Sequence, residues 1–286
     1  MKTLNSTHPS ALLQAGTRAN QGGGHGQPHA LVLAAHGSRR NTQANTLVYG
    51  HVERLKEVYH FPTVKAAFKQ GTPHFGEVLD SLTVNSVTVV PFFSSDGYFS
   101  RTVLPRELSL NRRYSQIHLH LTEAVGTHAR IPALAQRRIL ELLRHFQLEA
   151  QQTSLIVVGH GSPLHPKSSQ STHLLVDYLR KAKVCQEVQA AFLDESPFLE
   201  DVSGQVLQPE VVVFPFFIGD SYHVLQDIPR RAGFPELAGS SFPVQSRRGS
   251  QRVTIDRALG VDREITALIA ALAAPGLGQA ENGVSS

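Results

Sequence analysis

The sequence repeats itself at a fixed offset of 124 residues. Ala35-His36-Gly37-Ser38 recurs as Gly159-His160-Gly161-Ser162, and Pro91-Phe92-Phe93 recurs as Pro215-Phe216-Phe217. A repeat that keeps its register over so long a stretch indicates two copies of one structural unit. Further along, Gly126 matches Gly260, so the second copy carries an insertion, which we place within residues 233–250.

Each copy alternates short β-branched runs with longer amphipathic segments. Near-continuous apolar strands separated by helices are typical of parallel sheets covered on both faces. We therefore predict an α/β protein of two similar domains related by internal duplication, each with a four-stranded parallel sheet and helices on both faces. The predicted strands are residues 31–34, 64–68, 87–92 and 117–121 in the first copy, and 155–158, 188–193, 211–216 and 253–255 in the second.

The limits of the repeats divide the chain into four predicted segments. The N-terminal repeat is expected at 30–150 and the C-terminal repeat at 151–274. Residues 1–29 precede the first strand, and residues 275–286 are rich in Gly and Ser. Both ends are therefore predicted to be disordered tails.

Composition excludes several classes of protein. The chain has no apolar run of about 18 residues, so we expect no membrane span. Its single cysteine, Cys185, excludes internal disulfides and fits a reducing compartment, so we expect a cytoplasmic protein. The net charge of +4 suits anionic substrates and nucleic acid alike. The chain has no Lys/Arg block and no Trp, which argues against nucleic acid.

Histidines follow predicted strands in both copies, at the edge where parallel sheets bind ligands. His36 and His160 follow the first strand of each copy, and His223 lies in the loop after the third strand of the second copy. Imidazole binds borderline divalent metals and accepts protons near neutral pH. The alternative is a structural role, in which a glycine permits the turn and Ser38 or Ser162 caps the next helix.

Two acids follow the second strand of the second copy. Asp194 and Glu195 are candidates for a further metal ligand, and the alternative is that both are surface acids of a loop. We match them with Lys69 and Gln70 in the first copy, and Phe99 stands where the second copy has His223. Metal chemistry is therefore predicted in the second copy, with His36 either a residual ligand or a relic.

The residues around these histidines resemble the sirohydrochlorin chelatases, a family of class II tetrapyrrole chelatases. One matching motif is the strand that ends in His-Gly-Ser-Arg, within 31–39. The other is Pro215-Phe216-Phe217 followed by His223 and Asp227-Ile228-Pro229. The resemblance covers about residues 31–270, and in this respect the chain is similar to the long, duplicated form of the family. Many long relatives keep the histidine pair in the N-terminal half, where this chain has Phe99.

The resemblance implies insertion of Co²⁺ or Fe²⁺ into sirohydrochlorin or a related carboxylate-rich tetrapyrrole, in cobalamin or sirohaem synthesis. It implies a monomer whose halves enclose the macrocycle in a cleft, with the metal as substrate and no permanent cofactor. The implied catalytic residues are His160, His223 and His36, and the implied metal ligands are His160, His223 and either Asp194 or Glu195. Arginines at this edge suit carboxylate recognition. The residues predicted to bind substrate are Arg39, Arg101, Arg106, Arg230, Arg231, Tyr98, Tyr222, Ser38 and Ser162.

Other functions fit the sequence less well. No Arg precedes His36 or His160, as a histidine phosphatase requires, and the chain has no G-x-S-x-G elbow and no G-x-G-x-x-G after its first strand. The main alternative is a carrier that binds a tetrapyrrole or a metal at the same place without turning it over.

Overall fold

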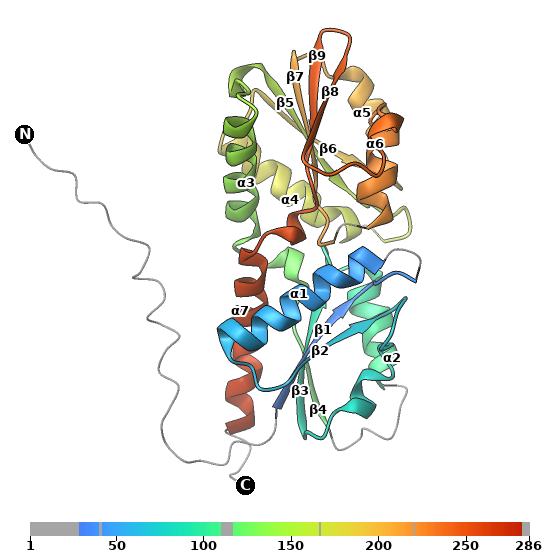
Figure 1. The fold of residues 1–286 in the computed structure, drawn as a ribbon, viewed down its shortest axis with the longest axis vertical. Coiled ribbons are helices and arrows are strands. Elements are labelled where there is room, and N and C mark those ends of the chain that lie inside the picture. The colour runs from blue at the N-terminus through green and yellow to red at the C-terminus, as the bar shows by residue number, and fades with distance from the viewer. Residues whose placement is uncertain (1–28, 40–41, 110–116, 166, 220, 282–286) are drawn as a thin grey trace, which may run out of the picture.

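The structure is a computed structural model that describes residues 29–39, 42–109, 117–165, 167–219 and 221–281. Its strands form two separate sheets, one from each repeat, which lie end to end in Figure 1. The first sheet has the order β2-β1-β3-β4 and is parallel throughout. Its strands are β1 (His29–Ala35), β2 (Val64–Phe68), β3 (Ser86–Phe92) and β4 (His118–Leu121).

The second sheet repeats this order and adds one strand, giving β6-β5-β7-β9-β8. Because its first four strands pair in parallel in the same order, the two repeats share one topology. The predicted α/β duplication is thereby confirmed. The strands are β5 (Thr153–Gly159), β6 (Glu187–Phe192), β7 (Glu210–Pro215), β8 (Val244–Arg248) and β9 (Gln251–Ile255).

The fifth strand corrects the prediction of four parallel strands for the second repeat. Strand β8 comes from the insertion and pairs antiparallel with β9 through a turn at Gly249, whose φ is +60°. Its residues are only half-buried and largely polar, as an edge strand requires. A strand with one apolar residue in five gives no apolar run, so β8 could not be predicted from a search for apolar strands.

The helices and helical turns connect the strands, except for the turn Leu259–Val261 and the last helix, which follow the last strand. The α-helices are α1 (Thr42–Tyr59), α2 (Leu104–Ser109), α3 (Ile131–His145), α4 (Lys167–Lys181), α5 (Leu199–Gln205), α6 (Ile228–Arg231) and α7 (Glu264–Glu281). Two π-helical turns, Phe99–Val103 and His223–Asp227, precede α2 and α6. Short 3-10 turns lie at Val78–Ser81, Val125–Thr127, Ala150–Gln152, Pro235–Leu237 and Leu259–Val261.

Alternate residues of the central strands point to opposite faces of each sheet, because a strand has a period of two. In β1, Leu31 and Leu33 pack in one core with residues of α1, whereas Ala30 and Val32 pack in another with Leu104 of α2. All are almost fully buried. Helices on both faces therefore explain why these strands are apolar along their whole length.

The last helix of each repeat packs against the other repeat. Helix α3 lies beside α4 and the second sheet, whereas α7 lies against β3, β1 and α1 of the first repeat (Figure 1). One continuous core consequently includes Leu31 of β1, Leu155 of β5, Ile139 of α3 and Leu268 of α7. The boundary between residues 150 and 151 stays a prediction, and this exchange joins the two repeats in space.

Two buried polar contacts hold the exchanged helices in place. Arg138 of α3 forms a two-point ion pair with Asp256 at the end of β9, with nitrogen-to-oxygen distances of 2.8 and 2.9 Å. In the other direction, the imidazole of His51 in α1 is 2.8 Å from the Thr266 hydroxyl and 3.0 Å from the Gly260 carbonyl. Neither helix is therefore held by apolar contacts alone.

The ends of the chain differ in part from the predicted tails. Residues 1–28 lie outside the described residues, and His29, assigned to the first tail, begins β1. At the other end, α7 runs to Glu281, so residues 275–281 are helical where a tail was predicted. The first turns of α7 are anchored by buried residues such as Ile265 and Ile269, and a helix once nucleated extends at little cost. Among the described helices, none is long and apolar enough to cross a membrane.

Candidate functional site

The candidate residues lie where the strands of each sheet end. His36 directly follows β1 and His160 directly follows β5, each in a turn with a glycine in the left-handed region. At Gly161, with φ +74°, a Cβ atom would lie 2.6 Å from Cγ of Glu195, so only glycine fits. His223 begins the π-helical turn after β7. The parallel topology thus brings these histidines to the carboxyl edges of the sheets, as predicted.

His160 and His223 face each other. Their ring centroids are 4.9 Å apart, with the planes at 78°. Each side chain is 44% exposed, so neither is sealed in the core. The aromatic ring of Phe217 lies behind His160, at 6.3 Å between centroids. Two half-buried imidazoles in contact are therefore available to a ligand from solvent.

In both histidines, the hydrogen bonds formed by the described residues involve Nδ1 only. Nδ1 of His223 is 2.7 Å from Oδ2 of Asp227, and a carboxylate only accepts, so Nδ1 carries the proton. Nδ1 of His160 is 3.1 Å from the Gly161 carbonyl oxygen, which likewise makes it a donor. No group of the described residues forms a hydrogen bond with either Nε2. Each Nε2 lone pair can therefore bind a metal ion.

His36 joins this group from the first repeat. Burial lowers the pKa of His36 below its ordinary value of 6.5, and the neighbouring imidazoles of His223 and His160 lower it further. Phe99 packs edge-on against the His36 ring, at 4.9 Å between centroids. His36 is therefore neutral at neutral pH. It also lies close enough to His160 and His223 for their charge to affect its pKa.

The two acids occupy different places. Oε2 of Glu195 accepts a hydrogen bond of 2.9 Å from the Ser162 backbone, which fixes the turn after β5. The Asp194 carboxylate is 49% exposed and lies 3.4 Å from Nδ1 of His160. Among the described residues, no three His, Cys, Asp or Glu side chains are arranged to hold a metal ion. The arrangement is thus an open pair of imidazoles rather than a closed metal cage.

The structure shifts the counterparts of these acids by one residue. Ala35 pairs with Phe68 in the first sheet, and Gly159 pairs with Phe192 in the second. Asp194 and Glu195 therefore correspond to Gln70 and Gly71, not to Lys69 and Gln70 as the sequence comparison suggested. In this register too, the first repeat has no acid at the positions of Asp194 and Glu195.

A separate charged cluster occupies the same region of the first repeat. Lys69 forms an ion pair with Glu107, and His74 lies 3.6 Å from that carboxylate. The counterpart of Glu107 in the second repeat is Arg231, which donates to the Leu193 carbonyl and lies 3.9 Å from Glu200. Arg231 is therefore engaged with its own repeat, although it was predicted to bind substrate.

The other predicted substrate-binding residues lie at the same edges. Arg230 donates to the Tyr222 hydroxyl at 3.2 Å, and Tyr222 is exposed beside His223. Arg101 pairs with Asp96. The Ser38 backbone donates to Asn45, in parallel with Ser162 and Glu195, so both serines belong to turns next to a histidine. Arg39 and Arg106 are exposed.

Tyr98 links the two repeats next to the histidines. Its ring stacks on that of His165, with centroids 4.7 Å apart and planes at 12°. A cavity of about 670 Å³ is lined by Arg101 of the first repeat and by Lys167 and Leu174 of α4. The carboxyl edges of the two sheets therefore meet, and residues of both repeats contribute to the space between them.

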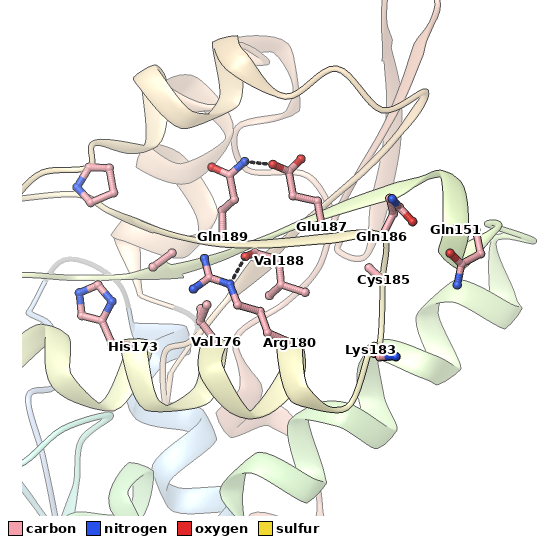
Figure 2. A pocket seen from close by; sticks show the side chains of 12 residues that line it. Gln151, His173, Val176, Arg180, Lys183, Cys185, Gln186, Glu187, Val188 and Gln189 are labelled. Atoms are coloured by element: carbon pink, nitrogen blue, oxygen red, sulfur yellow. Dashed lines mark hydrogen bonds between the residues drawn. The ribbon is translucent and has the colours of Figure 1, made fainter.

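A second cavity, of about 850 Å³, lies along β6 and α4 (Figure 2). Within it Arg180 donates to the Val188 carbonyl at 2.7 Å, and Gln189 donates to Glu187 at 2.6 Å. Its lining does not include His36, His160 or His223. It is thus distinct from the candidate site.

Asp227 and His165 are not among the site residues predicted from the sequence, where Asp227 appears only as part of a motif. Asp227 follows His223 by four residues, a spacing that brings side chains together on a helical turn. That spacing was visible in the sequence, but it acquires meaning only once the segment is known to be helical. His165 carried no signal, because its partner Tyr98 belongs to the other repeat.

Comparison with known proteins agrees with the fold. The sequence model of the CbiX family matches residues 30–142 and again residues 154–274. The chain belongs to the CbiX family, and both of its repeats are members. A curated relative from Halobacterium salinarum, described as a probable sirohydrochlorin cobaltochelatase, is 31% identical over 220 residues, which are 70% of this chain and 75% of the relative.

Solved structures show the same fold at lower identity. SirB from Bacillus subtilis, determined with Fe³⁺, superposes with a TM-score of 0.68 at 15% identity, covering 89% of this chain and 98% of SirB. The protein DR2241 from Deinococcus radiodurans, described as similar to chelatases with two additional domains, gives a TM-score of 0.63 at 20% identity. That match covers 87% of this chain but only 55% of the longer Deinococcus chain.

Proposed function

We propose that this protein inserts Co²⁺ or Fe²⁺ into sirohydrochlorin or a closely related carboxylate-rich tetrapyrrole. The observation that carries the proposal is the pair His160 and His223, whose rings are in contact. Each has its Nδ1 hydrogen-bonded, and its Nε2 has no partner among the described residues. Membership of the CbiX family and the description of the Halobacterium relative support the same reaction.

Metal insertion requires a site that holds a dication and then releases it. Two neutral imidazoles leave open coordination positions, which pyrrole nitrogens can fill as the ion moves into the ring. Of the two acids, Asp194 is the one available to the site, because Glu195 is hydrogen-bonded to the Ser162 backbone whereas Asp194 is half exposed. The Asp194 carboxylate lies 3.4 Å from Nδ1 of His160, so it would attract the dication and orient the His160 ring while Nε2 binds the metal. The metal is a substrate in this scheme, and no permanent cofactor is needed.

Insertion also releases two protons from the pyrrole nitrogens, so a base must lie near the ring. His36 suits this role because its pKa lies below the ordinary value of 6.5, and it is therefore neutral at neutral pH. It comes from the repeat opposite the metal pair, so a macrocycle between the repeats would have metal ligands on one side and a base on the other.

Arginines around the site would hold the carboxylate arms of the substrate. Arg230 with Tyr222 and the exposed Arg39 belong to different repeats, which suits a ring bound between them. Guanidinium groups pair with carboxylates through two parallel hydrogen bonds. We assign Arg101 and Arg106 to the same role, with Tyr98, Ser38 and Ser162 as neighbouring contacts.

The test is anaerobic incubation of purified protein with sirohydrochlorin and Co²⁺ or Fe²⁺, followed by absorbance against the uncatalysed rate. We expect multiple turnovers, which His223→Ala and His160→Ala abolish and His36→Ala slows. His145→Ala, at an exposed position of α3, is the control and should retain activity. Binding in a 1:1 ratio without turnover would support a carrier instead, and full activity in both ligand variants would refute the site.

We further propose that the protein acts as a monomer in the cytoplasm. Each chain already contains both repeats, so the site needs no second copy to be complete. The single cysteine, Cys185, is buried, which suits a reducing compartment. Light scattering of the purified protein tests the monomer.

A further inference from the structure

The carboxylate of Asp227 contacts His223 within one helical turn. The two residues are the last and the first of the π-helical turn His223–Asp227, and the Oδ2 to Nδ1 distance is 2.7 Å. The Asp227 side chain is only 26% exposed. Solvent therefore screens this contact less than it screens a surface pair.

Asp227 also occupies the position before the first residue of α6. Aspartate at such a position usually accepts a hydrogen bond from a backbone N–H of the first helical turn. Here its side chain makes no capping bond. The carboxylate is directed to the imidazole instead, so helix capping does not account for an aspartate at this position.

The first repeat shows that the turn itself does not need this pair. The residues 124 positions earlier are Phe99 and Val103, which begin and end an equivalent π-helical turn. The residues that precede the two turns, Tyr98 and Tyr222, have nearly equal backbone angles, with φ −58° and ψ −42° against φ −52° and ψ −39°. The turn thus folds with or without a His and an Asp, and the first repeat lacks both.

We propose that Asp227 is a positioning residue that holds His223 with Nδ1 protonated and Nε2 directed to the incoming metal. This inference rests on the proposed function, because it assigns a task to a residue of that site. A carboxylate behind a metal-binding imidazole fixes the ring and strengthens the opposite nitrogen as a donor. His160 has a weaker arrangement, with a backbone carbonyl at 3.1 Å and an exposed carboxylate at 3.4 Å from its Nδ1.

The direct test reads the tautomer of His223 in the metal-free protein by long-range ¹H–¹⁵N NMR at pH 8. We expect the Nδ1–H form in the wild type and in Asp227→Glu, and a mixture of both forms in Asp227→Val. Asp227→Val introduces the residue that the first repeat has at this position, so the turn should remain folded. Asp177→Asn, at an exposed site of α4, is the control and should resemble the wild type.

Metal binding and turnover complete the test. We expect Asp227→Val to weaken Co²⁺ binding by about 10- to 100-fold, with KM for the tetrapyrrole unchanged and kcat reduced. Asp227→Glu should recover most of both losses. An Nδ1–H tautomer and Co²⁺ affinity in Asp227→Val within about twofold of wild type would overturn the inference. If Asp227→Val changes the tautomer of His223 but the wild-type protein shows no turnover, the proposed function is refuted and the positioning of His223 by Asp227 is not.

Discussion

Removal of Arg138 is the sharpest test of the exchange of helices between the repeats. Arg138 belongs to α3 of the first repeat, and its guanidinium donates two hydrogen bonds to Asp256 at the end of β9 in the second. The Asp256 side chain is 1% exposed and that of Arg138 is 16% exposed. In Arg138→Ala, the Asp256 carboxylate would stay buried with the Arg257 backbone N–H, at 2.7 Å, as a remaining donor.

The expected loss follows from the desolvation of that carboxylate. Breaking a buried ion pair from one side costs about 3 to 5 kcal/mol. Because Asp256 keeps a backbone donor, we expect a loss near the lower end, about 3 kcal/mol in the free energy of unfolding. For a chain of this size, that lowers the melting temperature by roughly 6 to 12 °C. Urea denaturation followed by circular dichroism measures the loss.

The neighbouring arginine provides the matched control. Arg137 pairs with Asp262 at 2.8 Å, but its side chain is 41% exposed, so Arg137→Ala should cost no more than about 1 kcal/mol. Adding Asp256→Asn to Arg138→Ala should restore part of the lost stability, because it removes the buried charge. Equal losses in the two arginine variants would refute the reasoning, and so would a loss below about 1 kcal/mol in Arg138→Ala.

Two further predictions concern His51, which contacts the other repeat, and Gly260, which packs against Ile218 within the second repeat. Burial lowers the pKa of His51 below its ordinary value of 6.5, so its stabilising contribution is complete above pH 6.5 and is lost as the unfolded state takes up a proton below that pH. His51→Gln should therefore flatten the fall in unfolding free energy between pH 7.5 and pH 5.5, and parallel curves for the two proteins would contradict this. At Gly260, an added Cβ would lie 1.8 Å from the Ile218 carbonyl oxygen, so Gly260→Ala should cost on the order of 3 kcal/mol or leave no folded protein. In Gly204→Ala the new methyl group meets nothing within 4 Å, so this control should unfold at or above the wild-type urea midpoint.

Much of the fold could be predicted from the repeat and the apolar strands. A repeat in register requires two units of one topology, and parallel strands must place their following loops at a common edge. The positions of His36, His160 and His223 at those edges follow directly. That the rings of His160 and His223 lie in contact needed the structure, because sequence gives the edge but not the direction of a side chain. Their roles as metal ligands stay a prediction until the variants are assayed.

The sequence alone determined the duplication, the parallel α/β class and the asymmetry between a repeat with His223 and one with Phe99, because each is written in residue type and spacing. Only the tertiary structure decided that α3 and α7 exchange partners. The sequence of an amphipathic helix shows which of its faces is buried. It does not show which of two similar sheets that face packs against. The tertiary structure also decided two side-chain contacts. The contact of Asp227 with His223 depends on side-chain direction, and that of Tyr98 with His165 depends on the meeting of loops from different repeats.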